Sequence, residues 1–551
     1  MTGMTIKTRV IIVGGGPAGL VLAIELGRRN VPCVVIDQGT GSPSFPKANS
    51  TTSRTMEHYR RIGIVDRIRQ IGLPDNYPPD ISYHTRYAEH ELARLHWPSR
   101  EEALAKRLDE SDKWPTPEPM HRGQQMFIEP ILMDYASTFP SIELHYNTVA
   151  TAVEADDNGA TVRATHTPSG QEVVFEGAYV VGCDGPRSLV RSAMGVKYEG
   201  WAGEKRDFLG GRMMATFLNA PTFYTEGPRA PSWQYWCMNP ERRGIMMAID
   251  GKGLFAFHTQ LAEGQEASPA LAREWFDNLV GKELDYEVLG VAEWTAGFTL
   301  VAQTMQSGRM LLAGDAAHLF TPTAGLGYNT SVDDVANLGW KLAATINGWG
   351  GDKLLESYTL ERKPIAERNT RFARSLAEYF RTIKLPPEIE TDTPEGAKAR
   401  ADYGAELYDF AEREFAAPGI ILGVFYGTSP INTLEDGPPP RDEPNFHEPS
   451  ARPGARAPHV WMEDGKAVYD LFGKEFTLLQ LSDTADTSAF VAAAAAQDTP
   501  LTVLSIDNAR ARDLYQADLV LIRPDQHVAW RGSTLAAPEA EAIVARARGA
   551  D

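Results

Sequence analysis

Short apolar runs that end at glycine or aspartate recur along the chain and predict buried strands. The first covers residues 9–13 and leads through glycines into a helix-like stretch at 20–29, after which a second run ends at Asp37. Runs of the same character occur at 178–182 and 309–315. Continuous apolar runs are typical of strands buried on both faces, and the strand–helix–strand order indicates a βαβ unit in a parallel sheet. The later runs predict returns of the chain to that sheet.

A different period marks the middle of the chain. Apolar and polar positions alternate over 142–167, where Asp156-Asp157-Asn158-Gly159 is a predicted hairpin turn. Between about residues 200 and 300, short alternating segments such as 244–249 and 254–261 predict antiparallel strands. This part of the chain therefore indicates an antiparallel sheet inserted between the halves of the parallel-sheet domain.

Helical periodicity and turn residues divide the remainder. Helices are expected over 54–63, 129–139, 332–348 and 352–385. The stretch 73–119, rich in proline, charge and aromatic residues, is interpreted as an irregular excursion. After a predicted linker at Gly437-Pro438-Pro439-Pro440, a separate αβ pattern follows. Its expected elements are strands at 476–481, 501–506 and 518–522 and a helix at 487–496.

Charge and cysteine content narrow the class of protein. The chain has 551 residues and a formal net charge of −19, which argues against a nucleic-acid partner. Its three cysteines, Cys33, Cys183 and Cys237, form no CxxC pair and suit a reducing cytoplasm. We find no signal-peptide core, no run of membrane-span length and no metal-ligand pattern. We therefore expect a cytoplasmic protein with no membrane segment and no metal site.

The turn after the first strand carries the pattern Gly14-x-Gly16-x-x-Gly19. Gly14 permits a tight turn, Gly16 lets the backbone approach a pyrophosphate, and Gly19 lets the helix pack on the sheet. Asp37, at the end of the second strand, can accept hydrogen bonds from a ribose. The pattern predicts dinucleotide binding in preference to a plain strand–helix turn, and it leaves NAD and FAD open.

A second motif, Gly-Cys-Asp-Gly-Pro-Arg-Ser-Leu-Val-Arg, occupies residues 182–191 after another buried run. Asp184 and Gly185 form its centre. Taken alone, the segment is also explained as a helix start that Ser188 caps, with Arg191 as a surface charge. Both interpretations stay open from these residues.

The third motif spans residues 308–329 and contains Gly314-Asp315 followed by a glycine-rich turn. A carboxylate at a strand end, here Asp315, can bind a second polyol. The glycines let several backbone N–H groups point at one ligand, and a helix expected to begin near Asn329 would stabilise negative charge. His318 within the motif is a possible base, but a polar residue beside the cofactor is the simpler interpretation.

Together the three motifs resemble those of the single-component (class A) flavoprotein aromatic hydroxylases, the group that includes para-hydroxybenzoate hydroxylase. Order and spacing agree over about residues 9 to 375. The resemblance implies that the second motif serves FAD and the nicotinamide coenzyme and that Asp315 binds the ribityl or ribose part of FAD. Further matching segments are 53–57, Arg122-x-x-Gln125-x-x-x-Glu129 and 357–364.

The C-terminal part resembles the thioredoxin-like domain of the phenol hydroxylase and 3-(3-hydroxyphenyl)propionate hydroxylase branch. The matching segments are 452–458, 470–473 and 519–526. No cysteine lies beyond Cys237, so dithiol exchange is excluded, and a structural or dimer-related role is expected.

The expected architecture is α/β, with a discontinuous domain that has the FAD-binding Rossmann-like fold of the glutathione-reductase type. An antiparallel-sheet substrate domain is inserted in it, and a thioredoxin-like αβ domain without CxxC follows. The expected boundaries are 1–80, 120–200 and 300–385 for the FAD-binding domain, 81–119 and 201–299 for the substrate domain, 386–440 for a helical linker region, and 441–551 for the thioredoxin-like domain.

The resemblance also implies a reaction. NADPH or NADH reduces FAD, O2 then gives a C4a-hydroperoxyflavin, and its distal oxygen hydroxylates a phenolic or related aromatic small molecule. The expected catalytic positions, at the reactive edge of the flavin, are Pro322, Gly325, Leu326 and Gly327. The expected FAD contacts are Gly14, Gly16, Pro17, Ala18, Gly19, Asp37, Gln38, Lys47, Arg54, Gln125, Asp184, Gly185, Gly314, Asp315, Pro322, Gly325, Gly327, Tyr328 and Asn329.

Substrate contacts are expected from the inserted sheet. The candidates are Tyr224, Trp233, Tyr235 and His258, with Trp236 beside them, and each is more often a packing residue. Arg206 and Arg212 could pair with a substrate carboxylate, although surface charge explains them equally well. Lys47 stands where many relatives have an arginine and would lose its bidentate geometry. A homodimer is expected from the same resemblance.

The same scaffold also carries other activities. A flavin-dependent epoxidase or a Baeyer–Villiger-type monooxygenase, acting on a polyketide-like or other aromatic substrate, is the alternative. Halogenation is disfavoured because the tryptophan-rich signature of flavin halogenases is not found. A non-enzymatic carrier is disfavoured because Asp315 and its glycines are intact. The sequence leaves the substrate and the choice between NADPH and NADH open.

Overall fold

The computed structural model describes residues 4–551 except 42–44, 110–112, 203–207, 209 and 229. Its centre is a six-stranded sheet in the order β18-β19-β10-β2-β3-β6, parallel from β19 to β6. The strands are β18 (Gln306–Ser307), β19 (Met310–Leu312), β10 (Tyr179–Gly182), β2 (Val10–Val13), β3 (Cys33–Ile36) and β6 (Ile142–His145). The apolar runs of the sequence predicted β2, β3, β10 and β19, which are buried along most of their length.

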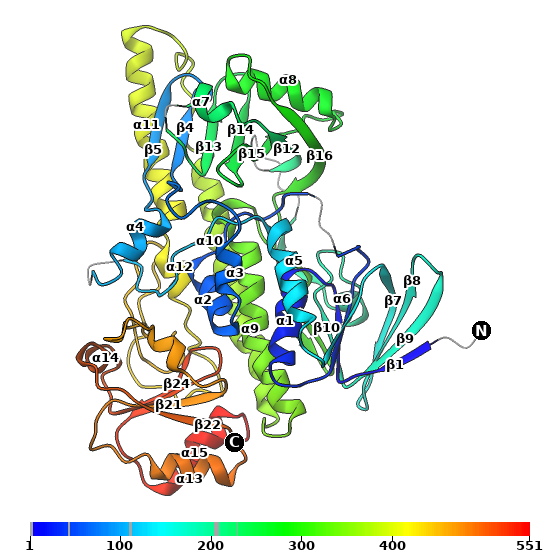
Figure 1. Cartoon of the computed structure of the whole chain (residues 1–551), viewed down its shortest axis with the longest axis vertical. Helices are drawn as coiled ribbons and strands as arrows, with labels where there is room; N and C mark the ends of the chain where they lie inside the picture. Colours follow the sequence, from blue (N-terminus) through cyan, green and yellow to red (C-terminus); the bar gives the residue numbers. More distant parts are fainter. Residues whose placement is uncertain (1–3, 42–44, 110–112, 203–207, 209, 229) are drawn as a thin grey trace.

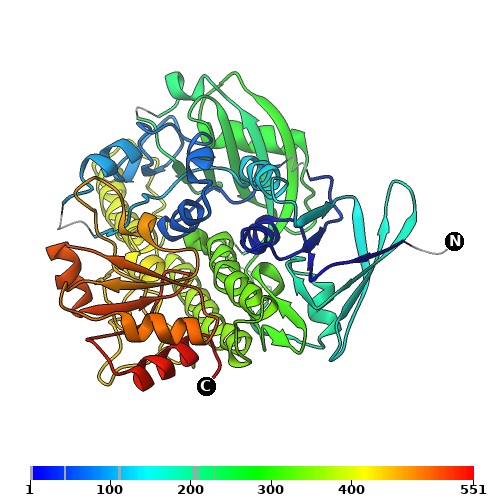
Figure 2. The same ribbon diagram turned by 60° about the horizontal axis from the view of Figure 1, so that its bottom comes forward.

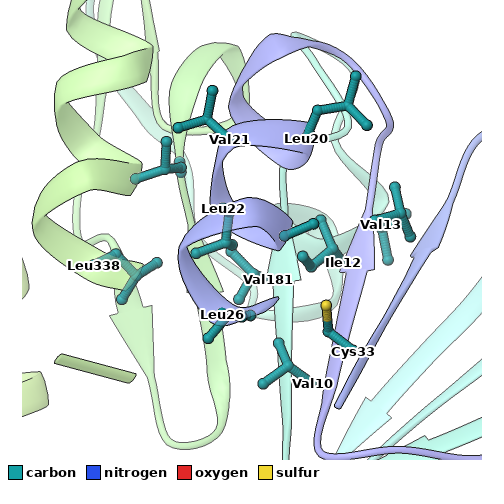
Figure 3. Packing of buried hydrophobic residues seen from close by; sticks show 14 of the residues in the cluster. Val10, Ile12, Val13, Leu20, Val21, Leu22, Leu26, Cys33, Val181 and Leu338 are labelled. Carbon is teal, nitrogen blue, oxygen red and sulfur yellow. The ribbon is translucent and has the colours of Figure 1, made fainter. Parts of the chain in front are cut away.

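Helix α1 (Pro17–Gly27) joins the first two parallel strands and packs between the sheet and α9 (Leu326–Ile346). Figure 3 shows apolar side chains of α1, of the strands and of α9 meeting in one layer. Around them lie α2 (Ser53–Ile62), α3 (Val65–Arg69), α5 (Gln125–Ala136), α6 (Leu189–Ala193) and α10 (Lys353–Phe380). The predicted starts of α2, α5 and α10 lie within about four residues of the observed ones, whereas α9 begins earlier than expected.

A four-stranded sheet flanks this layer in the order β1-β9-β8-β7 and projects from the body at the right of Figure 1. Its strands are β1 (Met4–Lys7), β9 (Gln171–Gly177), β8 (Ala160–His166) and β7 (Thr148–Ala155). The hairpin predicted between β7 and β8 is confirmed, since the Asp156 N–H donates to the Gly159 carbonyl at 2.9 Å.

The inserted sheet has seven strands in the order β16-β12-β15-β14-β13-β4-β5 and lies at the top of Figure 1. They are β16 (Glu287–Ala296), β12 (Gly211–Asn219), β15 (Leu254–Gln260), β14 (Arg243–Ala248), β13 (Gln234–Met238), β4 (Ile81–His84) and β5 (Glu91–Leu95). The sheet is antiparallel except where β4 runs parallel to β13. Interpreting 73–119 as irregular was wrong: it contains β4, β5 and α4 (Arg100–Ala105), and such short strands leave little periodicity to detect.

Helices cover both sides of this seven-stranded sheet. Helix α8 (Pro269–Val280) packs on one face, where Phe276 meets Phe257 of β15. Helix α11 (Pro394–Phe415) lies along β4 and β5, and its Phe410 meets Trp236 of β13. The shorter elements nearby are α7 (Phe223–Glu226), α12 (Pro418–Leu422), β11 (Tyr198–Trp201), β17 (Thr299–Ala302) and β20 (His318–Leu319).

The C-terminal unit has a four-stranded sheet in the order β22-β21-β23-β24. Its elements are β21 (Phe476–Gln480), α13 (Ser488–Ala496), β22 (Leu501–Ser505), α14 (Ala509–Tyr515), β23 (Leu519–Ile522), β24 (Val528–Gly532) and α15 (Ala537–Ala547). The strands and helix predicted from periodicity are confirmed, while α14, β24 and α15 were not predicted. Strand β21 is parallel to β22 and antiparallel to β23. Figures 1 and 2 both place this unit beside α9 and α10.

The thioredoxin-like interpretation of this unit stays a prediction, and so do the domain boundaries. No helix in the described part of the chain is long and apolar enough to cross a membrane.

Candidate active site

The glycine pattern after β2 forms a narrow turn that side chains would block. A Cβ on Gly14, whose φ is +108°, would lie 2.2 Å from the Cys183 carbonyl oxygen. A Cβ on Gly19 would lie 1.9 Å from the Gly14 carbonyl oxygen. Gly16 instead faces open space, with no atom within 4 Å of a Cβ there. The turn is therefore closed toward the protein and open at the N-terminus of α1, as a pyrophosphate site requires.

Helix α1 begins at Pro17, so its unpaired backbone N–H groups, including those of Ala18 and Gly19, lie next to this opening. Asp37 stands beside the turn, where its two carboxylate oxygens accept the Gly15 and Gly39 N–H groups, each at 2.6 Å. These bonds fix the orientation of Asp37. Gln38, next in the chain, is exposed.

The Gly-Asp motif meets this turn in space. A Cβ on Gly314 would lie 3.4 Å from the Cβ of Ala18, so two segments nearly 300 residues apart line one recess. The Asp315 side chain is exposed in this recess. The many protein atoms around its carboxyl still reduce its hydration, and this raises its pKa. Electrostatic interactions with Lys47 and His318 oppose this rise. The recess therefore combines an accessible carboxylate with a lysine and a helix N-terminus.

The Asp-Gly motif supports this recess through its hydrogen bonds. One oxygen of Asp184 accepts the Leu189 N–H at 2.7 Å, and the other is buried without a partner in the described part of the chain. Ser188 accepts the Arg191 N–H at 2.9 Å, so the helix-cap interpretation is confirmed. Arg191 is more than a surface charge, because its guanidinium donates to the Ala316 carbonyl at 3.0 Å.

A second brace acts through Tyr198. Its hydroxyl accepts from Arg191 at 2.7 Å and donates to the Asp315 carbonyl, and the guanidinium lies 3.8 Å from the Tyr198 ring centre. The Asp-Gly motif thus supports the Gly-Asp turn through its arginine. His318 is fully buried with its Nε2 2.6 Å from Asp334, which also pairs with Arg362 at 2.8 Å. This places His318 in the supporting structure.

The turn from Pro322 to Gly325 leads into α9, which begins at Leu326 and not near Asn329 as predicted. Gly325 caps the helix with φ +62°, a conformation that glycine adopts without strain, so the helix can start earlier than its apolar periodicity suggests. The first N–H groups of α9, at Leu326 and Gly327, have no intrahelical acceptor. The turn therefore presents backbone donors.

The side chains of the next two residues of α9 are engaged within the protein. The Tyr328 hydroxyl bonds to that of Tyr59. The Asn329 side chain accepts the Thr52 N–H at 2.8 Å and donates to the Ser50 carbonyl at 3.0 Å. Asn329 thus ties the chain before α2 to the start of α9, and only its backbone remains for a ligand.

The Arg54 side chain contacts the C-terminal unit. Its guanidinium donates to the Asp525 carbonyl at 2.6 Å and to Gln526 at 2.8 Å. Gln125 donates to Glu129 at 2.5 Å. The role of Arg54 as an FAD contact stays a prediction, and its side chain already has protein partners.

Arg122 is buried and is in no ion pair within the described part of the chain. Its guanidinium donates to Ser50 at 2.5 Å and lies 3.6 Å from the ring centre of Trp233. Burial lowers the pKa of Arg122 to about 9. It thus places an unmatched cation between the loop that precedes α2 and the inserted sheet.

Strand register separates the substrate candidates. His258 is paired with Ala215 and Ile245, on the same face of the sheet as Met247. The Met247 sulfur contacts the Asn49 amide, so this face is turned toward the FAD-binding region. The face that carries His258 is therefore the one turned toward the FAD-binding region.

The tyrosine candidates lie elsewhere. The Tyr77 hydroxyl lies 3.2 Å from that of Tyr224 and 3.5 Å from that of Tyr235, and it donates to the Ser232 carbonyl. Tyr235 is opposite Met246 and so lies on the face away from His258. These hydroxyls are used in packing. Trp233 is buried between Arg122 and Phe415.

Three further candidates come from the sequence. Trp236 lies on the His258 face and packs on Phe380 of α10. Arg212 pairs with exposed Glu293 at 2.7 Å, as a surface charge does. Arg206 lies outside the described residues.

No sequence motif marks two residues that the fold brings to this region. Glu414 of α11 is buried and accepts the Ala324 N–H at 2.8 Å, in the turn before α9. Ala324 has φ +64°, which is strained for a residue with a Cβ. Trp294 of β16 donates its indole N–H to His258. Neither residue belongs to a motif, so only long-range packing could reveal them.

Comparison with known proteins agrees with this geometry. Residues 7–373 match the family model described as FAD binding domain, and 450–550 match the model for the aromatic-ring hydroxylase C-terminal region. The chain is 30% identical to phenol 2-monooxygenase of Pseudomonas sp. (strain EST1001), with 98% of this chain and 92% of that protein covered.

Solved structures are similar over the whole chain. The rebeccamycin biosynthetic enzyme RebC with reduced flavin is 32% identical, with a TM-score of 0.88 and coverage of 99% of this chain and 100% of RebC. The flavin-dependent monooxygenase PieE in complex with FAD and substrate is 26% identical, with a TM-score of 0.89 and the same coverage. The predicted resemblance and the FAD cofactor are confirmed. The chain belongs to the FAD-binding aromatic-ring hydroxylase family, and it is an FAD-dependent aromatic monooxygenase.

Proposed function

We propose that this enzyme uses NAD(P)H and O2 to hydroxylate a phenolic or related aromatic small molecule. The observation that carries the proposal is the meeting of three parts at one place: the glycine turn at Gly16, the accessible Asp315, and the turn before α9. Phe320 and Ala324 of the last turn pack against the apolar cluster of the inserted sheet. An aromatic ring held by that sheet would therefore lie next to the backbone donors of α9.

The recess fits FAD on its own features. Gly16 leaves space, the N-terminus of α1 offers N–H donors, Asp37 is held beside the turn, and Asp315 is accessible. The pyrophosphate would lie at Gly14–Gly19, the ribose at Asp37, and the ribityl chain at Asp315. When bound, FAD supplies the hydride acceptance and oxygen activation that side chains cannot.

The protein's own part is to bind, orient and exclude water. Leu326 and Gly327 would donate backbone N–H bonds to negative charge on the flavin ring, because they are the free N–H groups of a helix N-terminus. Pro322 would shape the wall beside the reactive edge. None of these positions needs to act as an acid or a base.

The purified protein should be yellow and should oxidise NAD(P)H faster when a phenol is added. Asp315→Ala should lose most of its flavin, measured by absorbance after desalting, because the polyol loses its carboxylate acceptor. Asp513→Ala, an exposed aspartate of α14, is the matched control and should keep its flavin. Full flavin content in Asp315→Ala would show that the Gly-Asp motif is misassigned. Colourless protein that FAD cannot reconstitute would overturn the activity itself.

The homodimer, which rests on the resemblance, and the cytoplasmic location, which rests on the cysteine content, both belong to this proposal. Light scattering of the purified holoenzyme tests the first, and cell fractionation tests the second.

A further inference from the structure

His258 lies beside apolar residues on the side of the inserted sheet that faces the FAD-binding region. Its cross-strand partners are Ala215 in β12 and Ile245 in β14, both buried. Met247, on the same face, contacts Asn49 of the FAD-binding region. What this histidine can do depends on whether its ring is charged and on which ring nitrogen carries the proton.

Trp294 defines the tautomer. Its indole Nε1–H points at His258 Nδ1, with the nitrogens 3.2 Å apart and the rings 5.8 Å apart at 82°. An indole nitrogen is only a donor, so His258 Nδ1 must be the acceptor. The single proton of the neutral imidazole is therefore on Nε2.

The same contact keeps the imidazole from becoming a cation. Protonated histidine carries a hydrogen on both nitrogens, and the hydrogen on Nδ1 would then face the Trp294 N–H. Burial also lowers the pKa of His258 to about 4, and no carboxylate in the described part of the chain pairs with it. His258 is thus a neutral hydrogen-bond donor near neutral pH, and it is not placed to act as a general base.

The donor has no partner within the described part of the chain. Nε2 bonds to no described residue, and His258 is only half-buried, so this atom is available to a ligand. Its position on the FAD-facing side of β15 makes a bound aromatic molecule the natural acceptor.

We propose that His258 Nε2–H recognises an oxygen acceptor on the ring system of the substrate, with Trp294 holding the required tautomer. This rests on the proposed function and narrows its substrate class to aromatic molecules that carry a carbonyl, quinone or phenolic oxygen at the position facing β15. His258 is then a specificity residue that binds substrate, and Trp294 is a positioning residue that acts through it.

The tautomer is tested first and without turnover. Nitrogen NMR of labelled histidine in the FAD-loaded enzyme should show His258 protonated on Nε2 alone between pH 6 and 8. Trp294→Phe should change the His258 signals, because Nδ1 loses its donor. Protonation on Nδ1, or a doubly protonated ring in this range, would overturn the proposal.

Recognition is tested with paired aromatic substrates that differ only in one ring oxygen. A panel of naphthalenediols and the corresponding naphthols, which lack one of the two hydroxyl oxygens, supplies such pairs and is scored by stimulated NAD(P)H oxidation. For the pair member with the oxygen, His258→Phe should raise KM roughly tenfold with a smaller effect on kcat, as the loss of one hydrogen bond predicts. For the member without it, KM should stay the same. His258→Gln, which retains an N–H donor, should recover part of the loss, and Trp294→Phe should raise KM less than His258→Phe.

The control variant His166→Phe changes a histidine of β8 in the flanking sheet and should leave KM unchanged. Equal KM effects of His258→Phe on both pair members would overturn the proposal while leaving the monooxygenase activity intact. Absence of stimulation by every aromatic compound in the wild type would overturn the proposed function instead.

Discussion

The FAD-binding region has two large contact zones, and they differ in how buried charge is matched. Toward the C-terminal unit, the fully buried Arg523 lies 2.7 Å from Glu361 and 2.6 Å from Asp525. Lys341 of α9 lies 2.6 Å from the same Glu361. Toward the inserted sheet, the buried Arg122 has no opposite charge beside it in the described part of the chain.

Glu414 is a second buried ionisable group in the zone that faces the sheet, and it is an acid where Arg122 is a cation. It is buried near the sheet, and its one described partner is the neutral N–H of Ala324, while its second oxygen has none. Matched buried pairs hold two surfaces in one arrangement, whereas unmatched charges are costly unless a ligand or a proton satisfies them. The difference indicates that the C-terminal interface serves structure and that the sheet-facing zone serves the reaction.

The largest effect should come from breaking the matched zone. Glu361→Ala leaves Lys341 buried without its partner and removes one partner of Arg523. We expect the free energy of unfolding to fall by about 3–5 kcal/mol. Chemical denaturation measures it, and Glu356→Ala, an exposed residue of the same helix, is the control. A loss below about 1 kcal/mol would mean that the pairing contributes little to the interface.

A smaller effect, dependent on pH, is expected at Glu414. Burial raises its pKa to about 7, so the folded protein holds this proton more tightly than the unfolded chain does. The resulting stability is fully present below the ordinary carboxyl pKa and is lost as the pH rises through about 7. Wild type should lose on the order of 3 kcal/mol across this interval from this group.

Glu414→Gln does not titrate and should remove that part of the pH dependence, so that the variant is the more stable protein above pH 7. Denaturation at a series of pH values tests this, with Glu412→Gln, an exposed neighbour on α11, as the control. Parallel curves for Glu414→Gln and wild type would show that the acid is not held in its neutral form.

The smallest effect on stability is expected at Arg122. Arg122→Met removes an unmatched cation, so relief of its desolvation offsets the lost contacts with Trp233 and Ser50. We expect the unfolding free energy of FAD-free protein to change by no more than about 1 kcal/mol. The family resemblance implies that Arg122 approaches FAD, and charged hydrogen bonds are strong. The FAD dissociation constant, measured by flavin fluorescence, should therefore rise about tenfold.

Arg122→Lys should lie between wild type and Arg122→Met in FAD affinity, because it keeps the charge without the planar donor geometry. A loss of stability in Arg122→Met as large as that in Glu361→Ala would erase the contrast between the two zones.

Much of the cofactor site could be predicted because its requirements are local. Gly14 and Gly19 are excluded from bearing a side chain by backbone atoms a few ångströms away, and such constraints leave a fixed pattern in the sequence. The start of α9 was placed too late because Gly325 begins a helix through its backbone conformation and contributes nothing to apolar periodicity.

The substrate side was less predictable for a physical reason. In the sequence, Tyr235 and His258 are both ring-bearing residues in strands of alternating polarity, and nothing distinguishes them as substrate contacts. The register of the strands places them on opposite faces of the sheet. A shift of one residue reverses the face of every side chain in a strand, so composition cannot decide it. Arg54 matched a family segment, and the structure shows it holding the C-terminal unit.

The sequence by itself determined the parallel sheet, the three glycine motifs and hence the FAD-dependent class, because close backbone approach permits few residues. Only the tertiary structure decided which polar groups face the recess. It placed Trp294 against His258 and Glu414 against Ala324, across about 36 and 90 residues of chain. Such contacts arise from packing between separate elements, and no local pattern records them.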